Sequence, residues 1–448
     1  LTTTIINALV IQSLLFLSRL QVEQIQCYIM YGFGHSCGQK SCIMMVRIMG
    51  FLRANIVTYY VRKFIFKAKL IIENPSDWKY TRDIEPIRTQ KGIVILSHES
   101  NRLGASLLAE NIAKEMKRQG KDICILSRQF GELNSEYAQI APLQIFFSKR
   151  KFGKILIKLQ RLGYDRILVN TSVNGDCAKY ASDCGLKVIS LVHEMPKVIK
   201  QLKAEKSINE LVIYSDYVIF PTKKMQEEIT KEFGIVPLNL KIKPQGIYLR
   251  AARQQEMLQA KDKIKNKTIG YSKIVVGVGN TTSVKGFDYF LEMSRLAPKE
   301  ILFLWAGKKE SFYDTCIAKN TPPQNFIYLG KLVGADEMAA LYTLADVLAM
   351  TSRVDTFPSA VLEAMKFGAP VIGFAESGGV SEVVENGVNG ALINTMGDTD
   401  AFLQAIINII RNPNRYRTLS ENAKKTALNY SFENYVRFLI GLFDDERY

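Results

Sequence analysis

The sequence has few of the residues that usually bind metals. Its 448 residues include three histidines and seven cysteines, and no two cysteines form a CxxC pair. The spacing of His35, Cys37 and Cys42 matches no usual metal site. We therefore expect no metal site and no other cofactor. The odd number of thiols, without a disulfide framework, indicates a reducing cytoplasm.

Long hydrophobic runs are also missing. Residues 1–20 are apolar, but Gln12 and Ser13 interrupt them and no basic residues precede them, so neither a spanning helix nor a signal peptide is predicted. We expect residues 1–87 to form a leader that is partly basic and amphipathic. Because the chain begins with leucine, the pattern suggests an alternative start codon or a true start near residues 44–49.

Acidic residues are outnumbered by basic ones. Lys and Arg total 59 against 43 Asp and Glu, which gives a net charge of +16. Basic runs at 149–154, 197–206 and 261–267 carry much of this excess and indicate an anionic partner. We expect no nucleic acid, because the sequence lacks a Cys/His finger and an RNP-type aromatic motif. An anionic membrane surface or a phosphorylated substrate fits the charge. For any single run, a solvated helix face is the alternative.

Two parts of the chain alternate apolar, β-branched runs with amphipathic stretches. They cover residues 88–250 and 268–425, with a polar, Lys-rich stretch at 250–270 between them. This alternation predicts an α/β protein with two doubly wound, Rossmann-like domains that face a cleft, each with a parallel sheet covered on both faces. Ligands of such folds bind at the carboxyl ends of the strands. We expect the C-terminal residues 426–448 to form a helix that packs back on the first domain.

The expected strands are short. They are residues 92–98, 122–127, 166–170, 186–194 and 217–222 in the first domain, and 273–279, 300–307, 325–330, 345–352 and 369–375 in the second.

The segment RVDTFPSAVLEAMKFGAPVIGF follows one of these strands and predicts an anion site. Proline favours the first position of a helix, so Pro358 would leave Phe357 as the N-cap, and phenylalanine has no oxygen with which to cap. The amides of Ser359 and Ala360 would then be free at the positive end of a helix. A phosphate or diphosphate is the natural occupant of such a site.

Two carboxylates flank this helix start. Glu363 lies one turn beyond Ser359, about 6 Å along the helix axis, where it can accept hydrogen bonds from both hydroxyls of a ribose. Asp355 precedes the helix, where the group esterified to the distal phosphate would lie. The arrangement predicts a nucleotide sugar. The alternative is that Asp355 or Thr356 caps the helix and that Glu363 faces solvent.

This segment resembles the retaining glycosyltransferases of family four, the glycosyl transferases group 1 family with the GT-B fold. Their signature is an acidic residue, seven positions and then Glu, within a frame of PS, LEA and GxPV. Asp355 stands where the first residue is commonly Glu. The resemblance implies that Glu363 binds the ribose and that Asp355 contacts the donor sugar.

A second part of the resemblance is VGNTTSVKGFDYFLEM, from residue 278 onward. In the family this strand, loop and helix carry a basic pair that grips the diphosphate. Gly279 and Lys285 match, whereas Asn280 stands where many members have Arg. The resemblance implies that these residues contact the donor. Because one of the two cations is missing, we expect Arg353 to supply the second positive charge. A surface lysine beside a helix is the alternative for Lys285.

The first domain supplies two further motifs. SHESNRLGAS, at 97–106, resembles the family's first loop, in which Arg102 and Gly104 would approach the donor phosphate or the acceptor. LVHEMP, at 191–196, resembles the strand-end histidine motif. His193 would bind a hydroxyl of the donor sugar or reach the reacting centre, and a satisfied loop histidine is the alternative.

The resemblance implies a metal-independent transfer of a sugar from a nucleotide-diphosphate sugar, with retention of configuration. Lys285, Asp355 and His193 are the expected catalytic residues, with no covalent nucleophile. A lipid-linked or saccharide acceptor in bacterial cell-surface polysaccharide or glycolipid synthesis would suit a cytoplasmic protein that is peripheral at the inner face of the membrane. The alternatives are a non-catalytic GT-B scaffold that binds membrane or polysaccharide, and an epimerase or phosphorylase on the same fold.

Overall fold

The computed structural model describes residues 84–87, 91–247, 253–319, 321–332 and 334–445. The chain divides into two units, 1–76 and 77–448, and all described residues belong to the second. Almost the whole expected leader, with His35, Cys37 and Cys42, lies outside the described residues.

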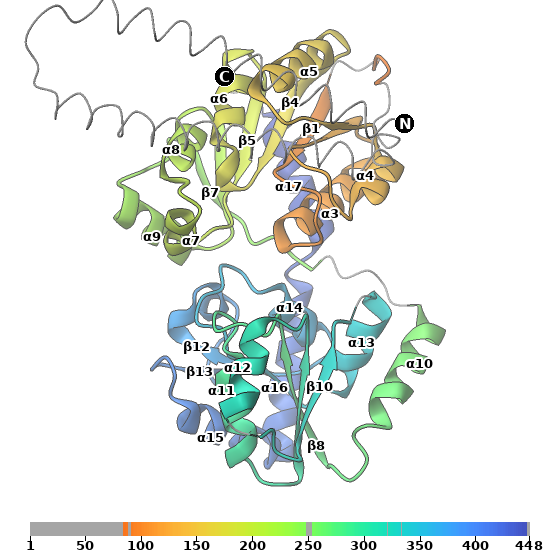
Figure 1. The fold of residues 1–448 in the computed structure, drawn as a ribbon, viewed down its shortest axis with the longest axis vertical. Helices are drawn as coiled ribbons and strands as arrows, with labels where there is room; N and C mark the ends of the chain where they lie inside the picture. The colour runs from red at the N-terminus through yellow and green to blue at the C-terminus, as the bar shows by residue number, and fades with distance from the viewer. Residues whose placement is uncertain (1–83, 88–90, 248–252, 320, 333, 446–448) are drawn as a thin grey trace, which may run out of the picture. The chain divides into compact units, whose positions relative to one another are not determined.

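The first domain contains a parallel sheet of seven strands in the order β3-β2-β1-β4-β5-β6-β7 (Figure 1). Its strands are β1 (Gly92–Ser97), β2 (Ile123–Ser127), β3 (Leu143–Ile145), β4 (Tyr164–Asn170), β5 (Lys187–Leu191), β6 (Tyr217–Phe220) and β7 (Leu240–Ile242). Its helices are α3 (Gly104–Arg118), α4 (Asn134–Ile140), α5 (Lys149–Arg161), α6 (Gly175–Asp183), α7 (Pro196–Gln201), α8 (Glu205–Ile213) and α9 (Lys223–Phe233), with a short 3₁₀ turn at Ser172–Asn174.

The second domain contains a parallel sheet of six strands in the order β10-β9-β8-β11-β12-β13. Its strands are β8 (Lys273–Val278), β9 (Ile301–Ala306), β10 (Phe326–Gly330), β11 (Val347–Met350), β12 (Val371–Phe374) and β13 (Gly390–Ile393). Its helices are α10 (Gln254–Lys265), α11 (Phe287–Leu296), α12 (Ser311–Lys319), α13 (Ala335–Leu344), α14 (Ser359–Lys366), α15 (Thr399–Ile410) and α16 (Pro413–Leu428), with 3₁₀ turns at Ala375–Ser377 and Gly379–Glu382.

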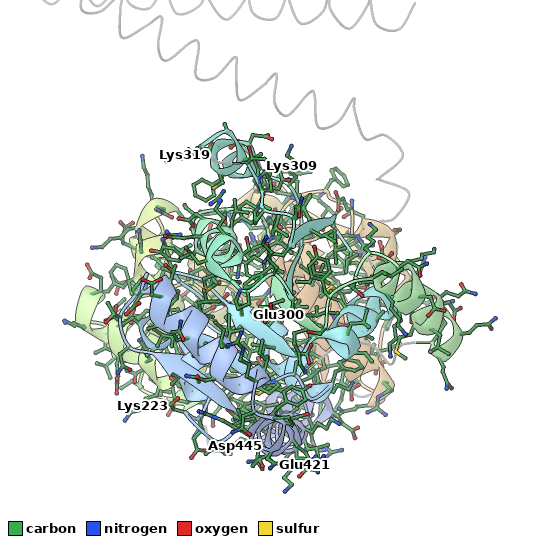
Figure 2. All side chains as sticks on the ribbon, turned by 90° about the horizontal axis from the view of Figure 1, so that it is seen from below. Lys223, Glu300, Lys309, Lys319, Glu421 and Asp445 are labelled. Atoms are coloured by element: carbon green, nitrogen blue, oxygen red, sulfur yellow. The ribbon has the colours of Figure 1, made fainter. Side chains whose placement is uncertain are left out.

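Both faces of each sheet are buried under helices. In β1, for example, Val94 and Leu96 face one hydrophobic core and Ile93 and Ile95 face the other. Because successive residues of a strand point to opposite faces, burial on both sides requires continuous apolar runs. Charged side chains are left to the outside, as Figure 2 shows for the labelled Lys223 and Glu421. The prediction of two doubly wound α/β domains is confirmed.

The strand order reverses once in each sheet. In the first sheet β1 lies between β2 and β4, and in the second β8 lies between β9 and β11. At such a point the crossover helices leave the sheet on opposite faces, which opens a crevice at the carboxyl ends of the strands. These two crevices are where the topology places a ligand.

The last helix returns the chain to the first domain. Helix α17 (Phe432–Asp444) packs against α3, and its buried Tyr435, Val436 and Leu439 belong to a core of the first sheet. Asp444 also pairs with Arg166 of β4, with an O–N distance of 2.6 Å. The Lys-rich stretch at 250–270 contains α10, which packs on α13 and so belongs with the second domain.

Candidate active site

A cavity of about 400 Å³ is lined by residues from the carboxyl ends of both sheets. Gly104 and Ala105 come from the segment after β1, His193 from the segment after β5, and Gly279 from the segment after β8. The remaining lining residues are Leu108, Glu194, Pro221, Gln245, Val278, Lys285, Met350 and 355–360.

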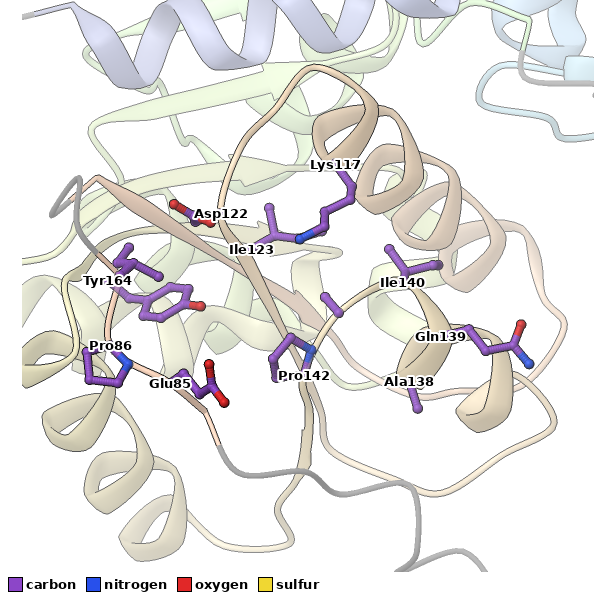
Figure 3. Close-up of a pocket in the computed structure, with 12 residues that line it drawn as sticks. Glu85, Pro86, Lys117, Asp122, Ile123, Ala138, Gln139, Ile140, Pro142 and Tyr164 are labelled. Atoms are coloured by element: carbon purple, nitrogen blue, oxygen red, sulfur yellow. The ribbon is translucent and has the colours of Figure 1, made fainter.

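A larger cavity, of about 610 Å³, lies at the opposite end of the first sheet (Figure 3). It is lined by Tyr164 and Ile123, which begin β4 and β2, and by Lys117, Asp122 and Pro142. Doubly wound sheets bind ligands at the carboxyl ends of their strands, not at the amino ends. We therefore take the smaller cavity as the candidate site.

The helix start predicted as an anion site lies in this cavity. Helix α14 begins at Ser359, and no side chain caps it. The N-cap is Pro358, not Phe357 as expected, because a ψ of 104° places Pro358 outside the helical region. The uncapped start is as predicted, and the alternative that Asp355 or Thr356 caps the helix is contradicted. Pro358, Ser359 and Ala360 all line the cavity.

A second uncapped helix start lines the same cavity. Helix α3 begins at Gly104 after Leu103, which has no capping oxygen, and its first turn contains no acidic residue. Gly104 and Ala105 both line the cavity. Two helix starts with free amides make this the part of the site best suited to negative charge.

Lys285 and Asp355 form an ion pair at the cavity wall. The Lys285 side chain is 33% exposed and that of Asp355 is 10% exposed. Lys285 lies across Gly279, where a Cβ atom would come within 3.0 Å of the lysine side chain and where φ is +149°. The glycine therefore allows the close approach. In this structure the groups predicted to hold phosphate and sugar neutralise each other.

The backbone of Asp355 is fixed by the loop after β12. Its N–H donates to Ser377 O at 2.7 Å, and its carbonyl accepts from Gly379 N at 2.9 Å. Gly378 has a φ of +126°, and a Cβ there would lie 2.1 Å from Asp355 O. Only glycine fits this close approach of two backbones, so the carboxylate is held in place by its own main chain.

His193 lies at the first domain's side of the cavity, directly after β5. Its Nε2 is 2.9 Å from Asn170 Oδ1. Burial lowers the pKa of His193 below its ordinary value of 6.5, the nearby Glu194 raises it in part, and His98 lowers it. The imidazole is therefore neutral at physiological pH.

Glu363 is buried and does not line the cavity. It is 8% exposed, and its Oε2 accepts a hydrogen bond from the Tyr342 hydroxyl at 3.0 Å. Burial raises the pKa of this carboxyl. The alternative of a solvent-facing Glu363 is contradicted. The carboxylate accepts a hydrogen bond from a tyrosine hydroxyl, and its predicted contact with a ribose stays a prediction.

Three other predicted residues lie outside the cavity lining. Arg353 makes two hydrogen bonds to the Asp288 carboxylate, at 2.8 and 2.7 Å, and lies 3.8 Å over the Tyr289 ring. Because Asp288 neutralises Arg353, the structure does not support the expectation that Arg353 supplies a second charge to a diphosphate. Arg102 pairs with Glu136, and Asn280 is exposed.

The sequence reasoning gave no role to Asn170, which contacts His193. The signal that could have found it is a polar residue at the last position of a central apolar strand, where ligands of this fold bind. The described residues contain no group of three or more His, Cys, Asp or Glu side chains arranged to hold a metal ion. None of the helices within the described ranges combines the length and apolar character needed for a membrane span.

Comparison with known proteins shows that part of the chain is similar to one family. Residues 259–426 match the family described as glycosyl transferases group 1. The alpha-galactosylglucosyldiacylglycerol synthase of Streptococcus pneumoniae is 28% identical over 179 residues, which are 39% of this chain and 46% of that protein. This chain therefore spans about half the length of that relative. The alpha-monoglucosyldiacylglycerol synthase of Acholeplasma laidlawii is 26% identical over 72% of this chain and 79% of its own length.

A similar solved structure is Anabaena HepE in complex with UDP. It has a TM-score of 0.67 and 19% identity, over 78% of this chain and 98% of that chain. At this identity the likeness establishes the fold alone. The predicted GT-B fold and the resemblance to the family are confirmed.

Proposed function

We propose that this chain, whose residues 259–426 match the glycosyl transferases group 1 family, transfers a sugar from a nucleoside diphosphate sugar to an acceptor hydroxyl. The observation that carries the proposal is the uncapped start of α14, which lines the cavity together with Lys285 and Asp355. A cation beside free helix amides is a site for a diphosphate, and a carboxylate next to it can bind sugar hydroxyls.

The same groups supply the chemistry of the transfer. Negative charge accumulates on the departing diphosphate in the transition state, and the Lys285 ammonium and the amides of Ser359 and Ala360 stabilise it. Binding of the diphosphate takes Lys285 from Asp355, whose carboxylate then contacts the sugar. We propose retention of configuration without a covalent intermediate and without a metal.

Glu363 binds the ribose in this proposal. It lies one turn beyond Ser359 on α14, and its carboxylate accepts a hydrogen bond from Tyr342. A ribose hydroxyl takes the place of the tyrosine hydroxyl when the donor binds. The exchange conserves the number of hydrogen bonds to a buried carboxylate, so it avoids the cost of leaving that group unpaired.

The acceptor is a lipid-linked or saccharide hydroxyl, which agrees with the two relatives named as diacylglycerol glycolipid synthases. We further propose that the protein is cytoplasmic and peripheral at the inner face of the membrane. Helix α5 supports this, because it contains no acidic residue. Its exposed residues Arg150, Lys154, Ile157, Lys158 and Arg161 are spaced to lie on one face. We call this face the α5 stripe.

The α5 stripe suits an anionic bilayer more than a solvated surface. Arg150 and Lys154 lie four residues apart on this face, where like charges repel one another unless anions face them. Ile157, which is 43% exposed, adds an apolar side chain among the cations. Peripheral membrane helices combine these two features.

A thermal-shift screen with UDP-, GDP- and dTDP-sugars tests the function. A donor that binds the folded state raises the melting temperature by mass action. Incubation of that donor with a lipid-linked or saccharide acceptor should then release the nucleoside diphosphate together with a glycosylated product. An isomerised nucleotide sugar would indicate an epimerase, and binding without any turnover would indicate a non-catalytic scaffold. Either outcome would refute the proposed function.

A further inference from the structure

Asn170 is a fully buried polar residue at the carboxyl end of β4. Its side-chain Nδ2 donates a hydrogen bond to the carbonyl oxygen of Ala105, in the first turn of α3, at 2.8 Å. Its Oδ1 lies 2.9 Å from Nε2 of His193. Asn170 therefore connects the start of α3 to the histidine, and both line the cavity.

These two contacts fix the chemical form of His193. Because Nδ2 donates to the carbonyl of Ala105, the amide oxygen of Asn170 is the atom that faces the ring. An amide oxygen can only accept a hydrogen bond, so Nε2 of His193 carries a proton. In a neutral ring Nδ1 is then unprotonated and can accept a hydrogen bond. The two contacts of His193 within the described residues are those of its backbone N–H with Glu194 and of its Nε2 with Asn170.

We propose that Asn170 is the positioning residue of His193, and that it holds the ring so that the unprotonated Nδ1 accepts a hydrogen bond from a ligand hydroxyl. This inference rests on the proposed function. The hydroxyl belongs to the donor sugar or to the attacking acceptor, which share the same chemistry. In the first case Asn170 acts on donor binding, and in the second it acts on the removal of the acceptor's proton.

The charged groups near His193 are few. Glu194 accepts from the backbone N–H of Ser172 at 3.0 Å and from that of His193 at 3.3 Å. His98 pairs through its Nε2 with Glu99 at 2.9 Å. Lys285 and Asp355 line the same cavity from the second domain. A charge introduced at position 170 would therefore be the only new charge in contact with the ring.

Two variants separate positioning from packing. Asn170→Asp keeps the shape of the side chain but places a carboxylate against Nε2, which should raise the pKa of His193 by about 1–3 units. The imidazolium then carries a proton on Nδ1, which cannot accept a hydrogen bond. Asn170→Ala removes the acceptor of the Nε2 proton, which should lower the pKa of His193 and allow the ring to turn. The rate of transfer should fall by about 100-fold in Asn170→Ala.

Asn174→Ala is the matched control. Asn174 is also fully buried, and its Nδ2 donates to the main-chain oxygen of Asn170 at 2.8 Å, but it does not contact the ring. Its loss should lower the melting temperature as the Asn170 variants do. It should leave the pKa of His193 and the pH dependence of transfer unchanged.

The experiment is an NMR titration of the histidine side chains in the full-length protein, alongside the pH profile of transfer. The chain has three histidines, and His193→Gln assigns the signal of interest. We expect opposite shifts of the His193 pKa in Asn170→Asp and Asn170→Ala, with the acidic limb of the pH profile following each shift.

An unchanged His193 pKa in both variants, or a pH profile that does not follow it, would overturn the proposal. If Asn170→Asp does not fold, the downward shift of the His193 pKa in Asn170→Ala still tests whether Asn170 positions His193. The titration needs no substrate, so an inactive wild-type protein with the expected shifts would refute the proposed function and leave the contact between Asn170 and His193 in place.

Discussion

At the scale of single residues, the central feature is the ion pair between Lys285 and Asp355. Each partner lowers the cost of the other's partial burial. A diphosphate competes for the lysine and frees the carboxylate for the sugar. The affinity for the donor therefore depends on the difference in free energy between the Lys285–Asp355 ion pair and the ion pair of Lys285 with the diphosphate.

Replacing Lys285 with Ala should reduce kcat by about 100- to 1,000-fold, because it removes a charge that stabilises the leaving diphosphate. Steady-state kinetics with the donor found in the thermal-shift screen measures this. The matched control is Lys273→Ala. Lys273 pairs with Asp346 at 3.1 Å and is 35% exposed, close to the 33% of Lys285, but it lies at the other end of β8. Equal losses in the two variants would contradict the assigned role.

His193 should make the protein less stable in mild acid. Burial lowers its folded-state pKa below the ordinary value of 6.5. The unfolded chain therefore binds the proton more readily, and the stability present above about pH 6.5 is lost as the pH falls through the folded pKa. Urea unfolding of the wild type and of His193→Gln, at about pH 7.5 and about pH 5.5, should show a larger acid-induced loss in the wild type. A larger loss in His193→Gln would contradict the lowered pKa.

At the scale of elements, the start of α14 lacks a stabilising N-cap side chain, and its free amides can bind an anion instead. An N-cap side chain would satisfy a free amide and stabilise the helix by about 1 kcal/mol. Pro358 cannot do so, and the amides are left for a ligand. Stability that a helix forgoes at a ligand site is a frequent cost of function.

Pro358→Asp tests this exchange against Pro358→Ala as the reference. The aspartate should cap α14 and raise the unfolding free energy by about 1 kcal/mol relative to alanine. The donor should bind at least about tenfold more weakly, because the carboxylate takes the amides and repels the diphosphate. Pro358→Asn, a neutral cap, should be intermediate in donor affinity. Calorimetric titration and urea unfolding give both quantities. Wild-type affinity in Pro358→Asp would show that the phosphates bind elsewhere.

The elements that the sequence predicted are those with long apolar runs. Ten strands were predicted by buried β-branched segments such as 273–279, and each has a counterpart in the sheets. The strands β3, β7 and β13 were missed. β3 and β7 have three residues each, which is too short for a recognisable period, and β13, with four residues, begins with a glycine. Their pairing with neighbours in the sheet, rather than their own composition, defines them.

Side-chain partners were harder to predict than the site's location. The sequence placed Pro358, Lys285 and His193 at the carboxyl ends of strands, and all three line the cavity. It could not show that Asp288 pairs with Arg353, that Tyr342 donates a hydrogen bond to Glu363, or that Asn170 contacts His193. These contacts join segments 21–65 positions apart, so spacing along the chain carries no signal for them.

At the scale of the whole molecule, the basic residues behind the net charge of +16 are unevenly distributed. Many surface lysines and arginines have acidic partners, such as Arg118 with Glu115 and Arg437 with Glu433. The α5 stripe contains no acid of its own, and Lys149 at the start of the helix reaches Asp176 at 3.5 Å. Positive charge concentrated on one face gives the molecule an orientation at an anionic surface.

Replacing Arg150, Lys154 and Arg161 with glutamine should abolish most binding to vesicles that contain anionic lipid. Each basic residue near such a surface contributes about 1 kcal/mol. Flotation with anionic and with neutral vesicles measures the effect. The control is the replacement of the exposed Lys263, Lys265 and Lys267, in and after α10, with glutamine. If both triple variants float like the wild type, or if the wild type shows no preference for anionic lipid, the α5 stripe is not a membrane surface.

The most direct measurement is a crystal structure of the protein with the nucleoside diphosphate that gives the largest thermal shift. Our account predicts the diphosphate within hydrogen-bond distance of the amides of Ser359 and Ala360, with the Lys285 ammonium turned from Asp355 to a phosphate oxygen. A diphosphate bound away from the start of α14, with Lys285 still paired to Asp355, would contradict it.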